Sequence, residues 1–139
     1  MNATKHEETN DQLRERAQRR ALENVELSRS GAGARVTDVV RNRLADGSLR
    51  VVITNSDRDV SRELVDHAFE ALRYSGLVCA PGADGAIALL GLTQPLDEVL
   101  AAIQWETGDA LGQLLSAARA QHVPVMLLPP SPGERAAES

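Results

Sequence analysis

Hydrophobic and polar positions follow one another along this chain in blocks that predict strands and helices in alternation. Residues 49–54 are mostly β-branched and apolar, which is typical of a buried strand. Apolar residues then recur at helical spacing over residues 60–72 and predict a helix, which Gly76 would end. Two more short apolar runs, at residues 77–80 and 86–90, predict further strands.

The link between those last two runs has five residues, 81–85 (Pro-Gly-Ala-Asp-Gly). A crossover between parallel neighbours needs a dozen residues or more, so this link cannot form one. Two arrangements stay open. The runs form an antiparallel hairpin, or the first run is a brief edge segment beside a different strand, and we favour the edge segment.

The last third of the chain combines a helical pattern with a terminal strand. Residues 93–95 (Thr-Gln-Pro) favour a helix start, since Pro is well suited to the first turn. The apolar positions that follow share one face if the helix runs unbroken to about residue 120. Residues 123–128 then predict a strand, and Pro124 favours a sheet edge or the first residues of that strand.

The only tryptophan gives the last helix two interpretations. On a helical wheel Trp105 falls on the side opposite the apolar face, together with Gly108 and Gly112. One interpretation is a continuous helix whose second face packs on another partner. The other is a break between Gln104 and Gly108, which would turn Trp105 inward and leave Glu106 at the start of a fresh helix.

The N-terminal part differs from the rest in composition. Residues 1–30 hold six acidic and six basic side chains with only a weak helical stripe, which Gly31-Ala32-Gly33 would end. We therefore expect a charged helical or mobile arm at residues 1–34. An α/β domain over 35–130 would follow, with Thr37 capping its first helix, and a disordered tail at 131–139 would close the chain.

This order of elements predicts a small, mainly parallel sheet of three or four strands with helices on both faces, a Rossmann-like or flavodoxin-like three-layer arrangement. Sheets of this kind bind ligands at the carboxyl ends of their strands. We expect the loops at residues 55–59 and 91–95 to lie at that edge.

Composition narrows the function classes. The chain has 139 residues, a net charge of −5, three aromatic residues and one Lys among its 15 basic residues, an Arg bias typical of GC-rich bacterial coding. Few aromatics and no basic face argue against nucleic-acid binding. No apolar run approaches the roughly 20 residues of a membrane span, and the N-terminus does not resemble a signal peptide, so we expect a cytoplasmic protein without a membrane partner.

Few residues carry recognisable chemistry. Ser56 and Arg58 follow the first strand, where a helix N-terminus favours anions, although helix capping explains Ser56 equally well. His67 and His122 have no second ligand at metal-binding spacing, so we expect no metal and no cofactor. Cys79 is the only cysteine, which excludes an intrachain disulfide, and its apolar setting predicts a buried thiol.

Residues 105–110 (Trp-Glu-Thr-Gly-Asp-Ala) resemble the aromatic-Glu-x-Gly-x-Ala element of nucleoside 2-deoxyribosyltransferases and deoxynucleotide N-glycosidases. Residues 92–95 resemble the segment that precedes that element, and Asp84 resembles an Asp before the family's strand. The resemblance implies an enzyme that cleaves or transfers a nucleoside glycosidic bond with Glu106 as nucleophile. With the residues above, the expected substrate-binding set is Asp84, Ser56, Arg58 and Trp105.

A second function stays open beside the enzyme. Glu106 is equally compatible with a solvated helix flank and Asp84 with a turn. The chain would then be a non-catalytic interaction or oligomerisation module that uses its N-terminal arm and the Trp105 helix face. The partners expected are a nucleoside or nucleotide ligand, and a second copy or another protein on the arm.

Overall fold

The structure, a computed structural model, describes residues 20–56, 59–82 and 85–129. These residues form one five-stranded sheet and four helices. The elements in chain order are β1 (Arg20–Val25), α2 (Ala32–Ala45), β2 (Arg50–Asn55), α3 (Arg62–Ala71), β3 (Leu77–Pro81), β4 (Ile87–Leu92), α4 (Asp97–Ala101), α5 (Ala110–Ala120) and β5 (Met126–Leu127).

The strands lie in the order β1-β2-β4-β3-β5. β1 pairs with β2 in parallel and β3 pairs with β5 in parallel, while β4 is antiparallel to both of its neighbours, β2 and β3. Four strands therefore run in one direction and one runs in the other. The sheet is mainly parallel, as the sequence predicted, but it has five strands because β1 joins it.

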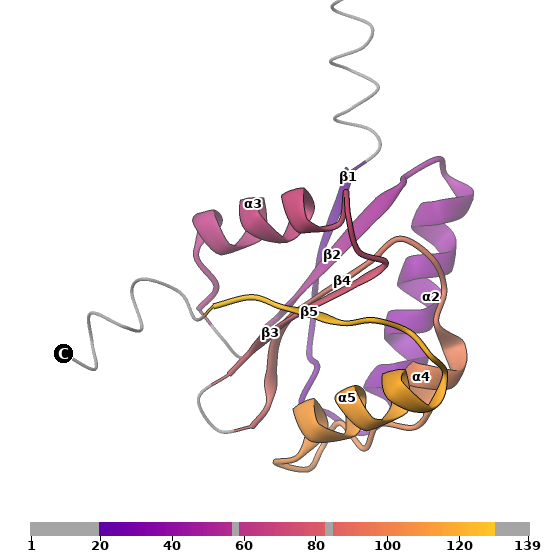
Figure 1. The fold of residues 1–139 in the computed structure, drawn as a ribbon, viewed down its shortest axis with the longest axis vertical. Coiled ribbons are helices and arrows are strands. Elements are labelled where there is room, and N and C mark those ends of the chain that lie inside the picture. Colours follow the sequence, from indigo (N-terminus) through magenta and orange to yellow (C-terminus); the bar gives the residue numbers. More distant parts are fainter. Residues whose placement is uncertain (1–19, 57–58, 83–84, 130–139) are drawn as a thin grey trace, which may run out of the picture.

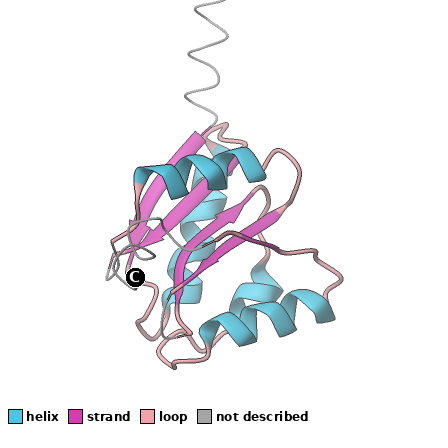
Figure 2. Cartoon of the chain, turned by 60° about the vertical axis from the view of Figure 1, so that its left-hand side comes forward, coloured by secondary structure: helices cyan, strands magenta, loops and turns pink. Residues whose placement is uncertain are grey.

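Helices cover both faces of the sheet. Helices α2, α4 and α5 lie on one side and α3 lies on the other (Figure 1), and a second view shows the same layers (Figure 2). The inner strand β2 belongs to both cores, since Val51 and Ile53 pack in the larger cluster and Val52 in the smaller one. A strand buried on both faces reads as a continuous apolar run, which is why this strand was predictable. The three-layer α/β class is confirmed.

β3 and β4 form an antiparallel hairpin, so the preference for an isolated edge segment was wrong. The Gly82 N–H donates to the Ala86 carbonyl at 2.8 Å and closes the connection. Because β4 runs backwards, residues 91–95 lie at the edge opposite the carboxyl ends of the parallel strands. The hairpin connection lies at the carboxyl edge instead, where residues 91–95 were expected.

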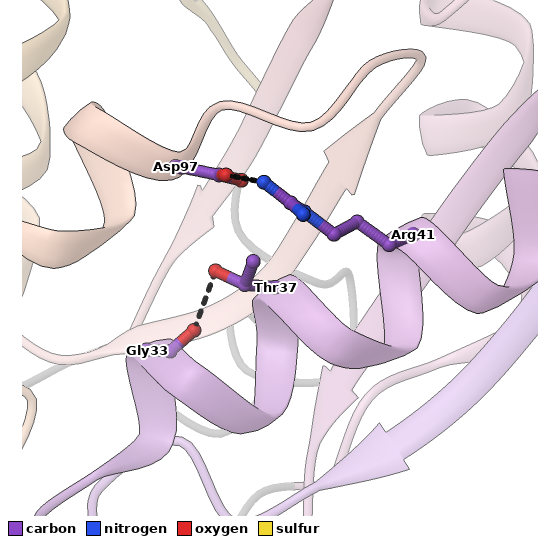
Figure 3. Close-up of polar contacts among 4 residues, drawn as sticks. All are labelled: Gly33, Thr37, Arg41 and Asp97. Carbon is purple, nitrogen blue, oxygen red and sulfur yellow. Dashed lines mark hydrogen bonds and ion pairs between the residues drawn. The ribbon is translucent and has the colours of Figure 1, made fainter.

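The structure places ordered elements where the sequence analysis expected the second half of the arm. β1 has a weak alternating pattern because it is an edge strand, in which only Ala21 is buried. Gly31 has a φ of +82° and opens α2 instead of ending a helix. Thr37 lies inside α2, where its hydroxyl donates to the Gly33 carbonyl at 2.9 Å (Figure 3). The expectations for residues 1–19 and 131–139 lie outside the described residues.

The predicted final helix is two helices, α4 and α5, separated by residues 102–109. Trp105 is turned inward and only 3% exposed, so the break and the inward Trp105 are confirmed. Glu106 does not start a helix, because α5 begins at Ala110. A Cβ at Gly33 would lie 3.0 Å from both the Trp105 Nε1 and the Leu100 carbonyl oxygen. Gly33 thus allows the first turn of α2 to pack directly on the end of α4.

An ion pair joins the same two helices further along. Arg41 of α2 points toward Asp97 in the first turn of α4 and bonds its carboxylate (Figure 3). Both side chains are well exposed, so the pair orients the helices more than it stabilises them. Among the described residues, no helix is long and apolar enough to cross a bilayer.

Cys79 lies fully buried in β3, and burial raises the pKa of its thiol to about 12. The unfolded chain ionises this thiol above pH 9 while the folded chain keeps it neutral. The stability that the neutral thiol contributes is therefore complete below pH 9 and is lost as the pH rises toward 12. Between about pH 8 and pH 10.5, the wild type should lose about 1–2 kcal/mol relative to Cys79→Ala.

Urea unfolding followed by circular dichroism at both pH values measures this difference, since other titrating groups cancel between the two proteins. In the native state, Cys79 should also react with a thiol reagent far more slowly than in urea. Equal reaction rates in the two states would contradict the assignment.

Candidate functional site

The carboxyl edge of the sheet is organised by one buried amide, that of Asn55 at the end of β2. Its Oδ1 accepts from the backbone N–H of Leu27 at 3.2 Å. Its Nδ2 donates to the carbonyl of Ile87 at 3.0 Å and to the hydroxyl of Ser28 at 3.3 Å. Asn55 is 1% exposed, so this side chain fixes the loop after β1 and the start of β4 against β2.

The hairpin connection and the start of α5 meet at the same edge. The Leu111 N–H of α5 donates to the Gly85 carbonyl at 3.1 Å. Gly85 has a φ of +83°, and a Cβ there would lie 2.4 Å from the Gly108 carbonyl oxygen. Only glycine fits this position, because both the backbone angle and the close approach exclude a side chain. The segment before α5 is thereby docked beside the carboxyl ends of the strands.

Two hollows flank the carboxyl end of β1. On the α2 side, a hollow of about 500 Å³ lies between β1 and the first turns of α2. On the α3 side, a hollow of about 510 Å³ runs along β1 toward Phe69. Asn24 lines both hollows, and both are of the size that small-molecule sites usually have. They adjoin the edge that Asn55 organises.

The hollow on the α2 side is lined by two arginines and two acidic residues, as is the hollow on the α3 side. Arg29 and Arg35 line the α2-side hollow together with Glu26 and Asp38. Arg29 pairs with Glu26 at 3.1 Å, and both side chains are exposed. α2 has no acidic residue in its first turn and no side-chain cap at Gly31, so the carboxylates nearest the positive end of its dipole are those of Glu26 and Asp38 in the hollow lining.

The structure brings together only part of the predicted substrate set. Ser56 is exposed at the end of β2, and its N–H donates to the Val25 carbonyl at 2.9 Å. Trp105 is buried in the larger core, and its Nε1 has no hydrogen-bond partner among the described residues. Arg58 and Asp84 lie outside the described residues.

Glu106 lies exposed on the turn between α4 and α5. The Thr107 hydroxyl closes this turn by donating to the Gln104 carbonyl at 2.8 Å. In the part of the chain that the structure describes, no group of three His, Cys, Asp or Glu side chains is placed to hold a metal ion.

Sequence reasoning missed Asn55 as an organising residue, along with Asn24, Arg29 and Arg35. Asn24 and Arg29 belong to the segment assigned to the arm, and Arg35 is the first residue of the domain assigned after it. One signal was available: a strand, then Ser-Arg-Ser-Gly-Ala-Gly over residues 28–33, then a helix. Gly31 and Gly33 were interpreted as a helix end, although glycines between a strand and a helix are equally typical of a turn that approaches a ligand.

Comparison with known proteins gives two matches. Over residues 3–107 the chain matches the family described as "Uncharacterized protein conserved in bacteria (DUF2064)". A crystal structure from Desulfovibrio desulfuricans G20, described as a "putative nucleotide-diphospho-sugar transferase", superposes with a TM-score of 0.65 and 26% sequence identity. The match covers 74% of this chain and 46% of that chain, so this chain spans less than half of the other. No curated protein matches.

These matches overturn the resemblance to nucleoside 2-deoxyribosyltransferases and N-glycosidases. The likeness was confined to short elements, whereas the transferase structure shares the fold over most of this chain. The function as a glycosidase was wrong, and the nucleophile role that the resemblance gave to Glu106 falls with it. The comparisons give no better support to the alternative, a non-catalytic interaction module.

Replacing Asn55 by Ala should destabilise the fold strongly. The Leu27 N–H and the Ile87 carbonyl would lose a buried partner, at a cost of about 1–3 kcal/mol each, or about 2–5 kcal/mol in total. Asn42→Ala, on the exposed side of α2, is the matched control and should change stability by less than about 0.5 kcal/mol. Urea unfolding measures both, and equal effects would show that the amide does not organise the edge.

Replacing Gly85 by Ala should strain the junction with α5. The left-handed backbone alone costs about 1–2 kcal/mol, and the clash with the Gly108 carbonyl adds to it. Gly76→Ala is the control, since its Cβ would lie 3.5 Å from Thr93 at an ordinary contact distance. Thermal unfolding should show a lower midpoint for Gly85→Ala alone, and unchanged stability in both variants would contradict the close approach.

Proposed function

This chain belongs to the DUF2064 family, and we propose that it binds a nucleotide-type ligand, a nucleotide-diphospho-sugar, at the carboxyl edge of its sheet. The observation that carries the proposal is the shared fold with the transferase structure, at 26% identity over 74% of this chain. The ligand class is taken from the description of that protein. Because this chain spans less than half of it, we propose binding of the sugar nucleotide and no complete transfer reaction.

The position of the site follows from the direction of the strands. α/β sheets take ligands outside the carboxyl ends of their parallel strands. In this chain that edge gathers the loops after β1 and β2, the hairpin connection and the turn before α5, and Asn55 and Gly85 hold them in place. An edge whose described parts are joined by these hydrogen bonds, beside two open hollows, supports ligand binding there.

The charges of the α2-side hollow suit a diphosphate. The N–H groups at the start of α2 and the positive end of its dipole favour an anion. Arg29 and Arg35 would add two cations beside it, and Arg29 would exchange its exposed pair with Glu26 for a phosphate. Ser56 stays a proposed ligand contact, since it is exposed at the end of β2 on the same edge.

The test is isothermal titration calorimetry of the full chain with UDP-glucose, GDP-mannose, their nucleoside diphosphates, and uridine and guanosine as ligands without phosphate. At least one sugar nucleotide should bind, and its free nucleoside should bind much more weakly. The double variant Arg29→Ala/Arg35→Ala should weaken that binding about ten-fold or more, because each charge-assisted hydrogen bond is worth about 1.5–3 kcal/mol.

Arg119→Ala is the matched control, since Arg119 is exposed in the last turn of α5 and α5 runs away from the carboxyl edge. This variant removes one positive charge, against two in the double variant, and should leave the dissociation constant unchanged. Absence of binding for every sugar nucleotide, or equal weakening by Arg119→Ala, would overturn the proposal.

A further inference from the structure

The edge strand β1 is open on its outer side among the described residues. It pairs only with β2, in continuous register from Arg20 with Arg50 to Val25 with Asn55. The strand has no proline and no bulge, which are devices that usually protect an edge from pairing. Leu22, at its middle, is 54% exposed although it lies in a strand.

The backbone of β1 offers a regular set of hydrogen-bonding groups on that side. The Val25 carbonyl points toward β2, because it accepts from the Ser56 N–H at 2.9 Å. Backbone groups alternate along a strand, so Ala21 and Glu23 also face β2. Arg20, Leu22 and Asn24 therefore direct their N–H and C=O groups outward.

The space on both sides of the strand is also open. Three hollows of about 500–560 Å³ lie along β1, two against α2 and one against α3. Neither helix layer closes over the outer side of β1, so another strand can approach it in the plane of the sheet.

We propose that β1 pairs with β1 of a second copy, antiparallel about a two-fold axis at Leu22, and joins two sheets into one of ten strands. In this register Leu22 faces Leu22 of the second copy, and Arg20 faces its Asn24. All three outward-facing residues then form hydrogen-bonded pairs. The two exposed leucines cover each other on the α3 face.

Neighbouring registers fit less well. An axis at Glu23 places two glutamates about 4.5 Å apart, in direct opposition. An axis at Ala21 places Asn24 beyond Arg20, the first described residue of the strand, and so forms fewer hydrogen bonds among the described residues. In the register at Leu22 no like charges face each other, because Arg20 meets an amide and Glu23 meets Ala21.

Sedimentation or light scattering of the full chain tests the dimer over a concentration series. The wild type, at 14.9 kDa per chain, should approach twice that mass. Leu22→Lys should remain a monomer, since it places two cations together at the axis. Leu49→Lys is the matched control, because Leu49 is 52% exposed and lies outside β1, and it should dimerise like the wild type.

Cysteine cross-linking tests the register. A hydrogen-bonded pair has Cα atoms about 5.5 Å apart, within disulfide range, and the single native cysteine is buried. Leu22→Cys should form a covalent dimer under mild oxidation, while Leu49→Cys should not. Arg20→Cys should cross-link to Asn24→Cys when the two are mixed, but neither to itself, since equivalent positions would be about 13 Å apart.

A wild-type protein that stays monomeric at all concentrations would overturn the proposal. A segment of the same chain that covers the outer side of β1 would also give a monomer and would overturn it in the same way. Cross-linking of Leu49→Cys as fast as Leu22→Cys would overturn it as well. The mass and cross-linking measurements use the protein without ligand, so their outcome is read separately from the titration with sugar nucleotides.

Discussion

The arrangement of the carboxyl edge depends on the buried amide of Asn55. The loop after β1 and the start of β4 each bring a backbone polar group that water cannot reach to the end of β2. The Asn55 amide, with one acceptor and one double donor, satisfies both groups. Because such groups are costly when unpaired, this side chain fixes where β2 ends, where β4 begins and how the loop after β1 turns.

The antiparallel direction of β4 decides which loops can share a site. A hairpin returns the chain to the edge it has just left, so the connection between β3 and β4 lies beside Asn55. The turn before α5 follows it there, held through Gly85 and Leu111. The loop after β4 lies at the opposite edge of the sheet instead. In a wholly parallel sheet built from the same elements, a different set of residues would lie at the carboxyl edge.

The sequence was informative wherever the apolar pattern was dense. β2 could be predicted because it is buried on both faces, and α3 because its buried residues recur at helical spacing on one face. β1 could not be recognised, because a strand with one neighbour buries little and its charges imitate a helical arm. The hairpin could not be chosen over an edge segment, since a five-residue link fits both. Of the site, Ser56 was predicted from its place after a strand and stays a prediction, whereas Asn55 resembles any polar residue at a strand end. The short element around Glu106 carried a resemblance that the fold as a whole does not share.

The packing of Trp105 on Gly33 has a practical consequence. It is the chain's sole indole, enclosed where α2 begins and where the chain turns from α4 to α5. All tryptophan fluorescence therefore originates at one dry junction about a helix turn from Arg35. The emission wavelength therefore reports on the surroundings of that junction, and no attached dye is needed.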